Sequence, residues 1–157
     1  MGHEMLLVMS IFLLTLATYT TPLRAAAPLP PEVQSAINEN VKSCDTKVVF
    51  EKGFVTRRDI NGDGIDDFIL DYENFGCGGN HTFFCGSAGC VTQVFASLSG
   101  GKFTKVLDDN VRGIKFEKVH GRPAMLLDLH GSACGKAGAE PCRKTLYWNG
   151  QNFSSAH

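Results

Sequence analysis

Residues 90–107 read Cys-Val-Thr-Gln-Val-Phe-Ala-Ser-Leu-Ser-Gly-Gly-Lys-Phe-Thr-Lys-Val-Leu. Valine, threonine and phenylalanine recur on both sides of a Ser-Gly-Gly turn, and such residues are enriched in strands. A Gly-Gly step between two segments of this kind is typical of a β-hairpin. The stretch therefore predicts two antiparallel strands, over 90–98 and 102–107, joined by a turn at 99–101.

The same pattern extends in both directions from this hairpin. Further strand-type segments, several of them separated by Gly, Pro or Asn-Gly turns, are 48–50, 54–55, 68–70 with Tyr72, 114–119, 124–129, 145–148 and 152–153. Because no helical segment lies between them, an antiparallel sheet is expected. Before them, apolar residues recur at helical spacing over 32–41, and Pro31 suits a first helical turn. The predicted fold class is mainly β, with antiparallel hairpins and one short N-terminal helix.

The length of 157 residues predicts one domain behind an export signal. Residues 5–17 form an apolar run that is too short to span a bilayer comfortably, and small residues follow at 25–27. We expect a signal peptide over 1–27 and a single mature domain over 28–157. Residues 1–4 lack the usual Lys or Arg, so an uncleaved N-terminal anchor is the alternative.

The formal net charge of −1 argues against two classes of partner. Nucleic-acid binding requires a markedly basic face, and attraction to a membrane surface requires a polybasic run. Neither is present, so we expect no nucleic-acid partner and no membrane insertion after cleavage.

All six cysteines lie in the expected mature domain. An even number behind an export signal predicts three disulfides, and the closely spaced Cys or His sets of a zinc site are missing. Short intervening loops favour pairing Cys85 with Cys90 and Cys134 with Cys142. The midpoint between Cys44 and Cys77 falls inside the segment at 58–67, which pairs them across one hairpin if that segment is its turn.

That segment, Arg-Asp-Ile-Asn-Gly-Asp-Gly-Ile-Asp-Asp over 58–67, concentrates four carboxylates and an asparagine. Counted from its first aspartate, oxygen ligands fall on positions one, three, five, seven and nine, with glycine at six for a sharp turn. This spacing is typical of calcium loops. Position twelve is Leu70, where an EF-hand places a bidentate glutamate. The expected ligands are Asp59, Asn61, Asp63, the Ile65 carbonyl and Asp67.

The Asp-x-Asn-x-Asp-Gly-x-x-Asp pattern, followed at once by Phe68-Ile69-Leu70, resembles the calcium loop of FG-GAP and integrin-α β-hairpins. The resemblance covers about twenty residues and implies a loop between two strands with a ligand set that ends at position nine. A propeller needs at least four blades, so only the hairpin and its ion are carried over. The mature chain is also similar to small exported proteins of Gram-negative bacteria that have one such loop, six cysteines and no assigned activity.

Two alternatives to a calcium loop are open. A polar turn that forms its own side-chain hydrogen bonds also explains Asn-Gly and Asp-Gly, although such a turn does not require aspartate at both positions one and nine. Magnesium is less suited, because it prefers fewer protein ligands and retains its waters. We expect structural Ca²⁺.

No catalytic motif stands out. Neither Gly-x-Ser-x-Gly nor His-Glu-x-x-His occurs, so no catalytic residue is assigned. The chain is expected to be an exported calcium-binding β domain, periplasmic or secreted, that binds an unknown protein or envelope component. The alternative is a periplasmic hydrolase with a site near Asp128, His130 and Ser132.

Overall fold

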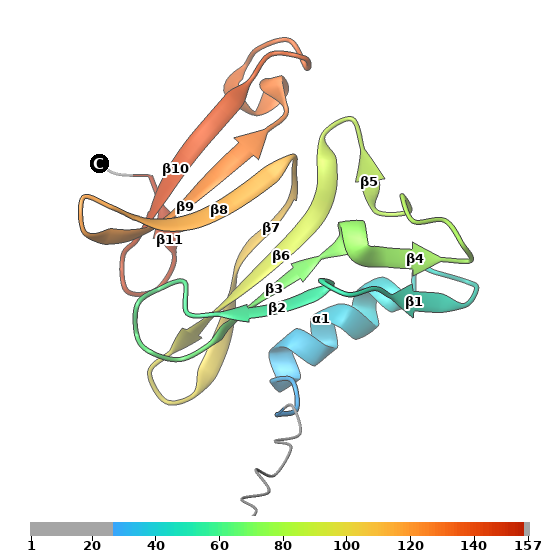
Figure 1. Ribbon diagram of the computed structural model, residues 1–157, viewed down its shortest axis with the longest axis horizontal. Coiled ribbons are helices and arrows are strands. Elements are labelled where there is room, and N and C mark those ends of the chain that lie inside the picture. The colour runs from blue at the N-terminus through green and yellow to red at the C-terminus, as the bar shows by residue number, and fades with distance from the viewer. Residues whose placement is uncertain (1–26, 156–157) are drawn as a thin grey trace, which may run out of the picture.

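The computed structural model describes residues 27–155, and the chain folds there into three layers, with 48% of the residues in strands. The predicted signal peptide lies outside the described residues, except for Ala27. In Figure 1 the helix α1 lies on one side of a central sheet and a second sheet lies on the other. The predicted fold class, mainly β with antiparallel sheets and one helix, is confirmed.

The helix α1 spans Pro31–Val41 and matches the predicted segment. Its first residue is proline, whose missing N–H has no intrahelical partner at this position in any case. Val33, Ala36 and Ile37 are buried along one face. The helix therefore packs by the apolar stripe that its sequence predicted.

The central sheet is antiparallel, and the hairpin over residues 89–111 is its longest part. Its strands run in the order β2, β3, β6 and β7, and the short β5 pairs with the start of β6. Their bounds are Val55–Arg58 for β2, Asp67–Asp71 for β3, Cys85–Gly86 for β5, Gly89–Leu98 for β6 and Lys102–Val111 for β7. The strand β7 continues four residues beyond its predicted end, because β6 supplies pairing partners as far as Cys90.

The second sheet consists of the C-terminal strands in the order β11, β10, β9 and β8. Their bounds are Gly113–Val119 for β8, Arg122–Leu129 for β9, Cys142–Trp148 for β10 and Phe153–Ser154 for β11. The tight β8–β9 turn is made by His120 and Gly121, with φ angles of 51° and 78°. Both predicted hairpins are present; β8, β9 and β10 are longer than predicted, and β11 has the predicted two residues, shifted by one position.

A long interrupted hairpin has the acidic segment at its tip. Near the tip β2 pairs with β3, and farther away β1, Val48–Phe50, pairs with β4, Phe75–Cys77. The 3₁₀ turn η1 at Tyr72–Asn74 lies between the two ladders. Val48 is directly opposite Cys77 in this ladder. Cys44, which forms the disulfide with Cys77, precedes Val48 by four residues.

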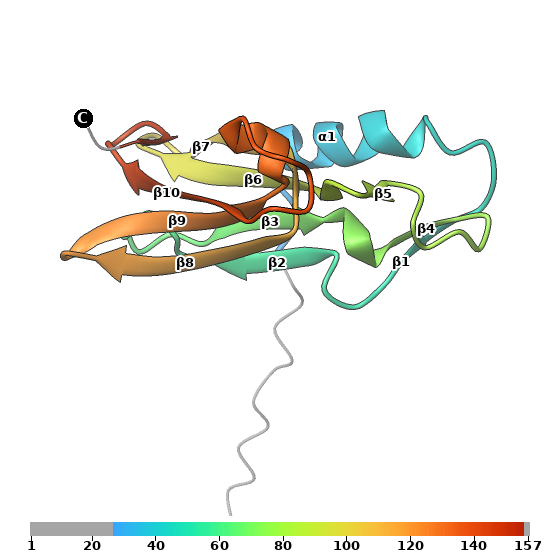
Figure 2. The same ribbon diagram turned by 90° about the horizontal axis from the view of Figure 1, so that it is seen from above.

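The two faces of the central sheet supply two separate cores. On β3, Phe68 and Leu70 pack with α1, β1 and β4, whereas Ile69 between them packs with the second sheet. This is the alternation expected of a strand that is covered on both faces. Figure 2 shows the same arrangement from above.

The three disulfides have the predicted pairing. They join Cys44 to Cys77, Cys85 to Cys90 and Cys134 to Cys142. The last closes the loop after the 3₁₀ turn η2, Gly131–Cys134. Disulfides persist in oxidising compartments, so a location outside the cytoplasm is indicated.

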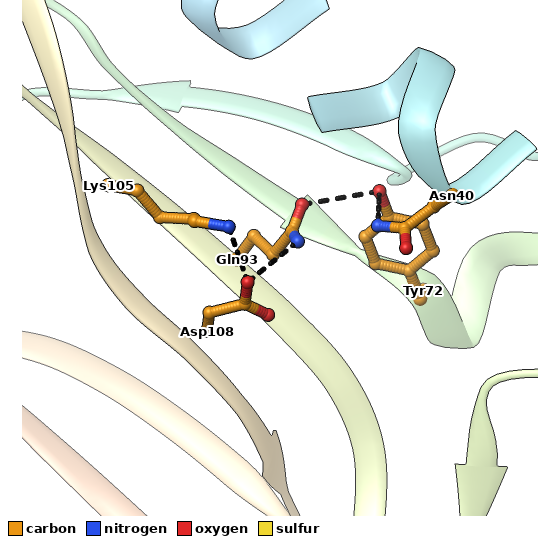
Figure 3. Close-up of polar contacts among 5 residues, drawn as sticks. All are labelled: Asn40, Tyr72, Gln93, Lys105 and Asp108. Carbon is orange, nitrogen blue, oxygen red and sulfur yellow. Dashed lines mark hydrogen bonds and ion pairs between the residues drawn. The ribbon is translucent and has the colours of Figure 1, made fainter. Parts of the chain in front are cut away.

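A chain of polar side chains links α1 to β7 through the buried core (Figure 3). The amide of Asn40 donates to the Tyr72 hydroxyl at 2.6 Å, and this hydroxyl donates to Gln93 Oε1 at 3.3 Å. Gln93 in turn donates to Asp108, which also contacts Lys105. Burial raises the pKa of Tyr72, so its hydroxyl keeps its proton and donates to Gln93. The chain fixes the helix against the sheet.

Candidate metal centre

The acidic loop closes the β2–β3 hairpin, in which Arg58 faces Asp67. Its backbone turns sharply at Gly62 and Gly64, with φ angles of 85° and 83°. A side chain at these positions would be strained, because L-residues rarely adopt positive φ. Glycine at these two positions therefore lets alternate residues of the loop turn toward one another.

The first half of the loop is held by its own side chains. The Asp59 carboxylate accepts from the N–H groups of Gly62 and Gly64 at 2.7 and 3.0 Å. Asn61 Oδ1 accepts from the Asp63 N–H at 3.0 Å, and Asp63 Oδ1 accepts from the Ile65 N–H at 2.8 Å. These are the hydrogen bonds of a polar turn, and they come from the side chains of the loop itself.

The second half of the loop converges on Ser97, a buried residue of β6. Asp67 is completely buried: its Oδ2 accepts from the Ile60 N–H at 2.8 Å and its Oδ1 from the Ser97 N–H at 2.7 Å. Asn61 Nδ2 donates to the Ser97 carbonyl at 3.0 Å. The central sheet therefore holds two of the predicted ligands from a distant position in the chain.

The Ser97 hydroxyl lies between two carboxylates. Its Oγ is 2.8 Å from Asp63 Oδ2 and 2.7 Å from Asp67 Oδ1. A serine hydroxyl has one hydrogen to donate, so it satisfies only one of these contacts when both carboxylates are ionised. One of the two carboxylates therefore lacks this hydrogen, and Asp63 Oδ2 accepts a further hydrogen bond from Asn61 Nδ2 at 3.2 Å.

The two carboxyl groups respond to this environment in opposite directions. Burial raises the pKa of Asp67 above its ordinary value, and hydrogen bonds from Ser97 and Ile60 oppose the rise without cancelling it. The negative charge of Asp63 adds to that rise. For Asp63, burial also raises the pKa, but hydrogen bonds from Ile65, Ser97 and Asn61 outweigh it, so the pKa is lowered.

In the part of the chain that the structure describes, no basic side chain forms an ion pair with a loop carboxylate. The ion pairs found within residues 27–155 are His81–Glu51, Lys105–Asp108 and Arg143–Asp128, and none involves a loop carboxylate. Arg58, next to the loop, donates instead to the Phe116 carbonyl at 2.9 Å. A buried carboxylate without a partner of opposite charge is costly, and Asp67 is one.

The structure gathers some of the five predicted ligands and not others. Asn61, Asp63 and Asp67 meet at Ser97, whereas the Asp59 carboxylate faces the glycine N–H groups. Ile65, whose carbonyl is the predicted ligand, donates its N–H to Asp63 Oδ1 at 2.8 Å. Within the described residues, no three His, Cys, Asp or Glu side chains lie close enough together to hold a metal ion. Calcium binding at this loop stays a prediction.

The donor chemistry of the loop fits calcium, because every predicted ligand is a carboxylate, amide or carbonyl oxygen. A carboxylate oxygen that accepts one N–H has a further lone pair for a cation. A cavity of about 220 Å³ borders the loop at Asp59 and Gly62, on the side of β8 and β9. Asp66 is exposed on the outside of the loop.

Sequence reasoning missed Ser97 as a member of this cluster. The residue was assigned only to a strand, and 30 positions separate it from Asp67. No local motif marks a contact of this kind, since it depends on the register of β3 against β6, in which Phe68 faces Phe95.

The alternative site at Asp128, His130 and Ser132 has a structural explanation. His130 Nδ1 accepts from the Ser132 hydroxyl at 2.7 Å and from the Ser132 N–H at 3.4 Å, and so caps η2. The other side of the ring packs closely on Gly138. Asp128 lies 3.9 Å from Arg143 on the neighbouring strand. No observation at these residues favours a hydrolase.

Compared with protein-family models, curated proteins and solved structures, the chain has no match. Within the described residues, no helix is long and apolar enough to cross a membrane.

Proposed function

We propose that this chain is an exported, disulfide-stabilised β domain that binds calcium at Asp59, Asn61, Asp63, Ile65 and Asp67. The loop would be of the type found in FG-GAP and integrin-α hairpins, with the ion in a structural role. The observation that carries the proposal is the uncompensated carboxylate pair, Asp63 and Asp67, which shares one hydroxyl hydrogen. A divalent cation supplies the missing positive charge.

The biological role would be the binding of a protein or envelope component in the periplasm or outside the cell. Three disulfides support an oxidising compartment. Exposed aromatic side chains support a contact surface: Phe50 and Phe83 are 49% and 38% exposed, and both pack on the buried Phe75. Aromatic residues of this kind are enriched where proteins bind one another.

The test is thermal unfolding of the purified protein in EDTA and with added Ca²⁺. A ligand present at about one hundred times its Kd stabilises the folded state by about 2.7 kcal/mol. For a domain of this size the melting temperature rises by roughly 5–10 °C. Mg²⁺ at the same concentration should give a smaller rise.

Two variants sharpen the measurement. Asp63→Ala should abolish the calcium-dependent rise, whereas Asp66→Ala, at the exposed neighbouring aspartate, should keep it. An equal melting temperature of the wild-type protein in EDTA and in calcium would refute the proposed metal site.

A further inference from the structure

We propose that Ser97 is the positioning residue that sets the calcium affinity of the acidic loop, although it lies outside the loop and its sequence motif. This inference rests on the proposed calcium-binding function. It assigns to a residue of the central sheet a role that the loop cannot perform by itself.

Ser97 contacts three predicted ligands with different groups. Its backbone N–H donates to Asp67, its carbonyl accepts from Asn61, and its hydroxyl reaches both Asp63 and Asp67. Ser97 is 1% exposed, Asn61 is 6% exposed and Asp67 is completely buried. Water therefore does not replace the contacts to Asn61 and Asp67, whereas the Asp63 side chain is exposed.

The hydroxyl is the one group of Ser97 that joins the two carboxylates. The backbone groups of residue 97 hold Asp67 and Asn61, and any amino acid except proline supplies the same N–H. Of the groups of Ser97, only the hydroxyl contacts Asp63 Oδ2, at 2.8 Å, and Asn61 Nδ2 donates to the same oxygen at 3.2 Å. Without the Ser97 hydroxyl, no shared hydrogen offsets the repulsion between the Asp63 and Asp67 carboxylates. Cation binding must then also bring these two side chains together, which weakens the affinity.

The position of Ser97 in the sheet makes it a firm anchor. Ser97 pairs with Phe103 of β7, the ladder with β3 begins two residues away at Phe95, and the residue between, Ala96, is fully buried. Binding sites are more precise when their supporting residues lie on such rigid elements. Residues that orient metal ligands from outside the ligand set typically change metal affinity about 10–100-fold when replaced.

The test compares Ser97→Ala with Ser99→Ala in the full protein, by calorimetric titration with Ca²⁺ and by melting temperature in EDTA and in calcium. Ser99 lies in the same hairpin and is exposed, so it is the matched control. We expect the Kd for calcium to rise about tenfold or more in Ser97→Ala and to stay at the wild-type value in Ser99→Ala.

The outcomes separate this inference from the proposed function. If wild-type protein does not bind calcium, the proposed function fails and the inference falls with it. If wild-type protein binds and Ser97→Ala has the same Kd, only the inference is overturned. An equal loss of melting temperature in EDTA and in calcium shows a purely structural serine and also overturns it. If Ser97→Ala does not fold, Ser97→Thr, which keeps the hydroxyl, must retain the wild-type Kd, and a tenfold loss there overturns the inference.

Discussion

Replacing Asp67 by alanine should destabilise the protein even when no metal is present. The carboxylate accepts hydrogen bonds from the Ile60 N–H, the Ser97 N–H and the Ser97 hydroxyl, at 2.7–2.8 Å. The hydroxyl has Asp63 as a second acceptor, so the two backbone N–H groups are left unpaired.

The size of the effect follows from these two groups. Leaving a buried donor unsatisfied costs about 1–3 kcal/mol, which gives a loss of about 2–6 kcal/mol for the pair. Removal of an uncompensated buried charge offsets part of this loss. We therefore expect the free energy of unfolding to fall by about 3 kcal/mol, which corresponds to a melting temperature lower by roughly 10 °C.

Urea unfolding in EDTA measures this change, with the fluorescence of the single tryptophan, Trp148, as the signal. This side chain packs at 5.1 Å from Phe153 in the core between the two sheets, so it reports global unfolding. Asp66→Ala is the control and should change stability by less than about 0.5 kcal/mol. If Asp67→Ala is as stable as Asp66→Ala, solvent reaches the two N–H groups and the reasoning from burial is wrong.

Three further substitutions test contacts in other parts of the fold. Tyr72→Phe removes the hydroxyl that pairs the buried Gln93 of β6 with the partly buried Asn40 of α1, and it should lower the free energy of unfolding in urea by about 1–3 kcal/mol; a neutral result would mean that the polar chain does not hold the helix. The Arg112 guanidinium donates to carbonyls of two disulfide-closed loops at 2.8–3.2 Å. Arg112→Ala should therefore lower the free energy of unfolding by about 1–2 kcal/mol, with faster hydrogen exchange confined to those loops. Replacing Cys44 and Cys77 together by serine opens the disulfide with the largest sequence separation, 33 residues, and should cost about 3–4 kcal/mol in thermal unfolding, more than either of the other two pairs.

The local elements of this fold could be predicted because their signals are local. The hairpin at 90–107 has a Gly-Gly turn between two strand-type segments, and the helix has its apolar residues at the right spacing. The pairs Cys85–Cys90 and Cys134–Cys142 close short loops. In each case the interacting residues lie within about twenty positions of one another, where pattern and turn chemistry determine the geometry.

The features that could not be predicted depend on contacts between distant segments. β7 continues through Asp108, Asp109 and Asn110, which are poor strand formers, because the facing residues of β6 pair with them. The extra residue Val106 bulges where the register shifts, and nothing in its neighbourhood marks it. The contact between Asn40 and Tyr72 spans 32 positions. Tertiary pairing overrides local propensity at each of these places.

The same division between local and distant contacts governs the candidate site. The loop motif supplies its own turn, in which Asp59 binds the N–H groups of Gly62 and Gly64. The negative charge at Asp67 is buried by the sheet, and Ser97 on β6 brings it next to Asp63. Because the turn is already ordered by hydrogen bonds, a cation would not have to fold it. We therefore expect calcium to raise the melting temperature of a protein that is folded without it, rather than to switch folding on as zinc does in a zinc finger.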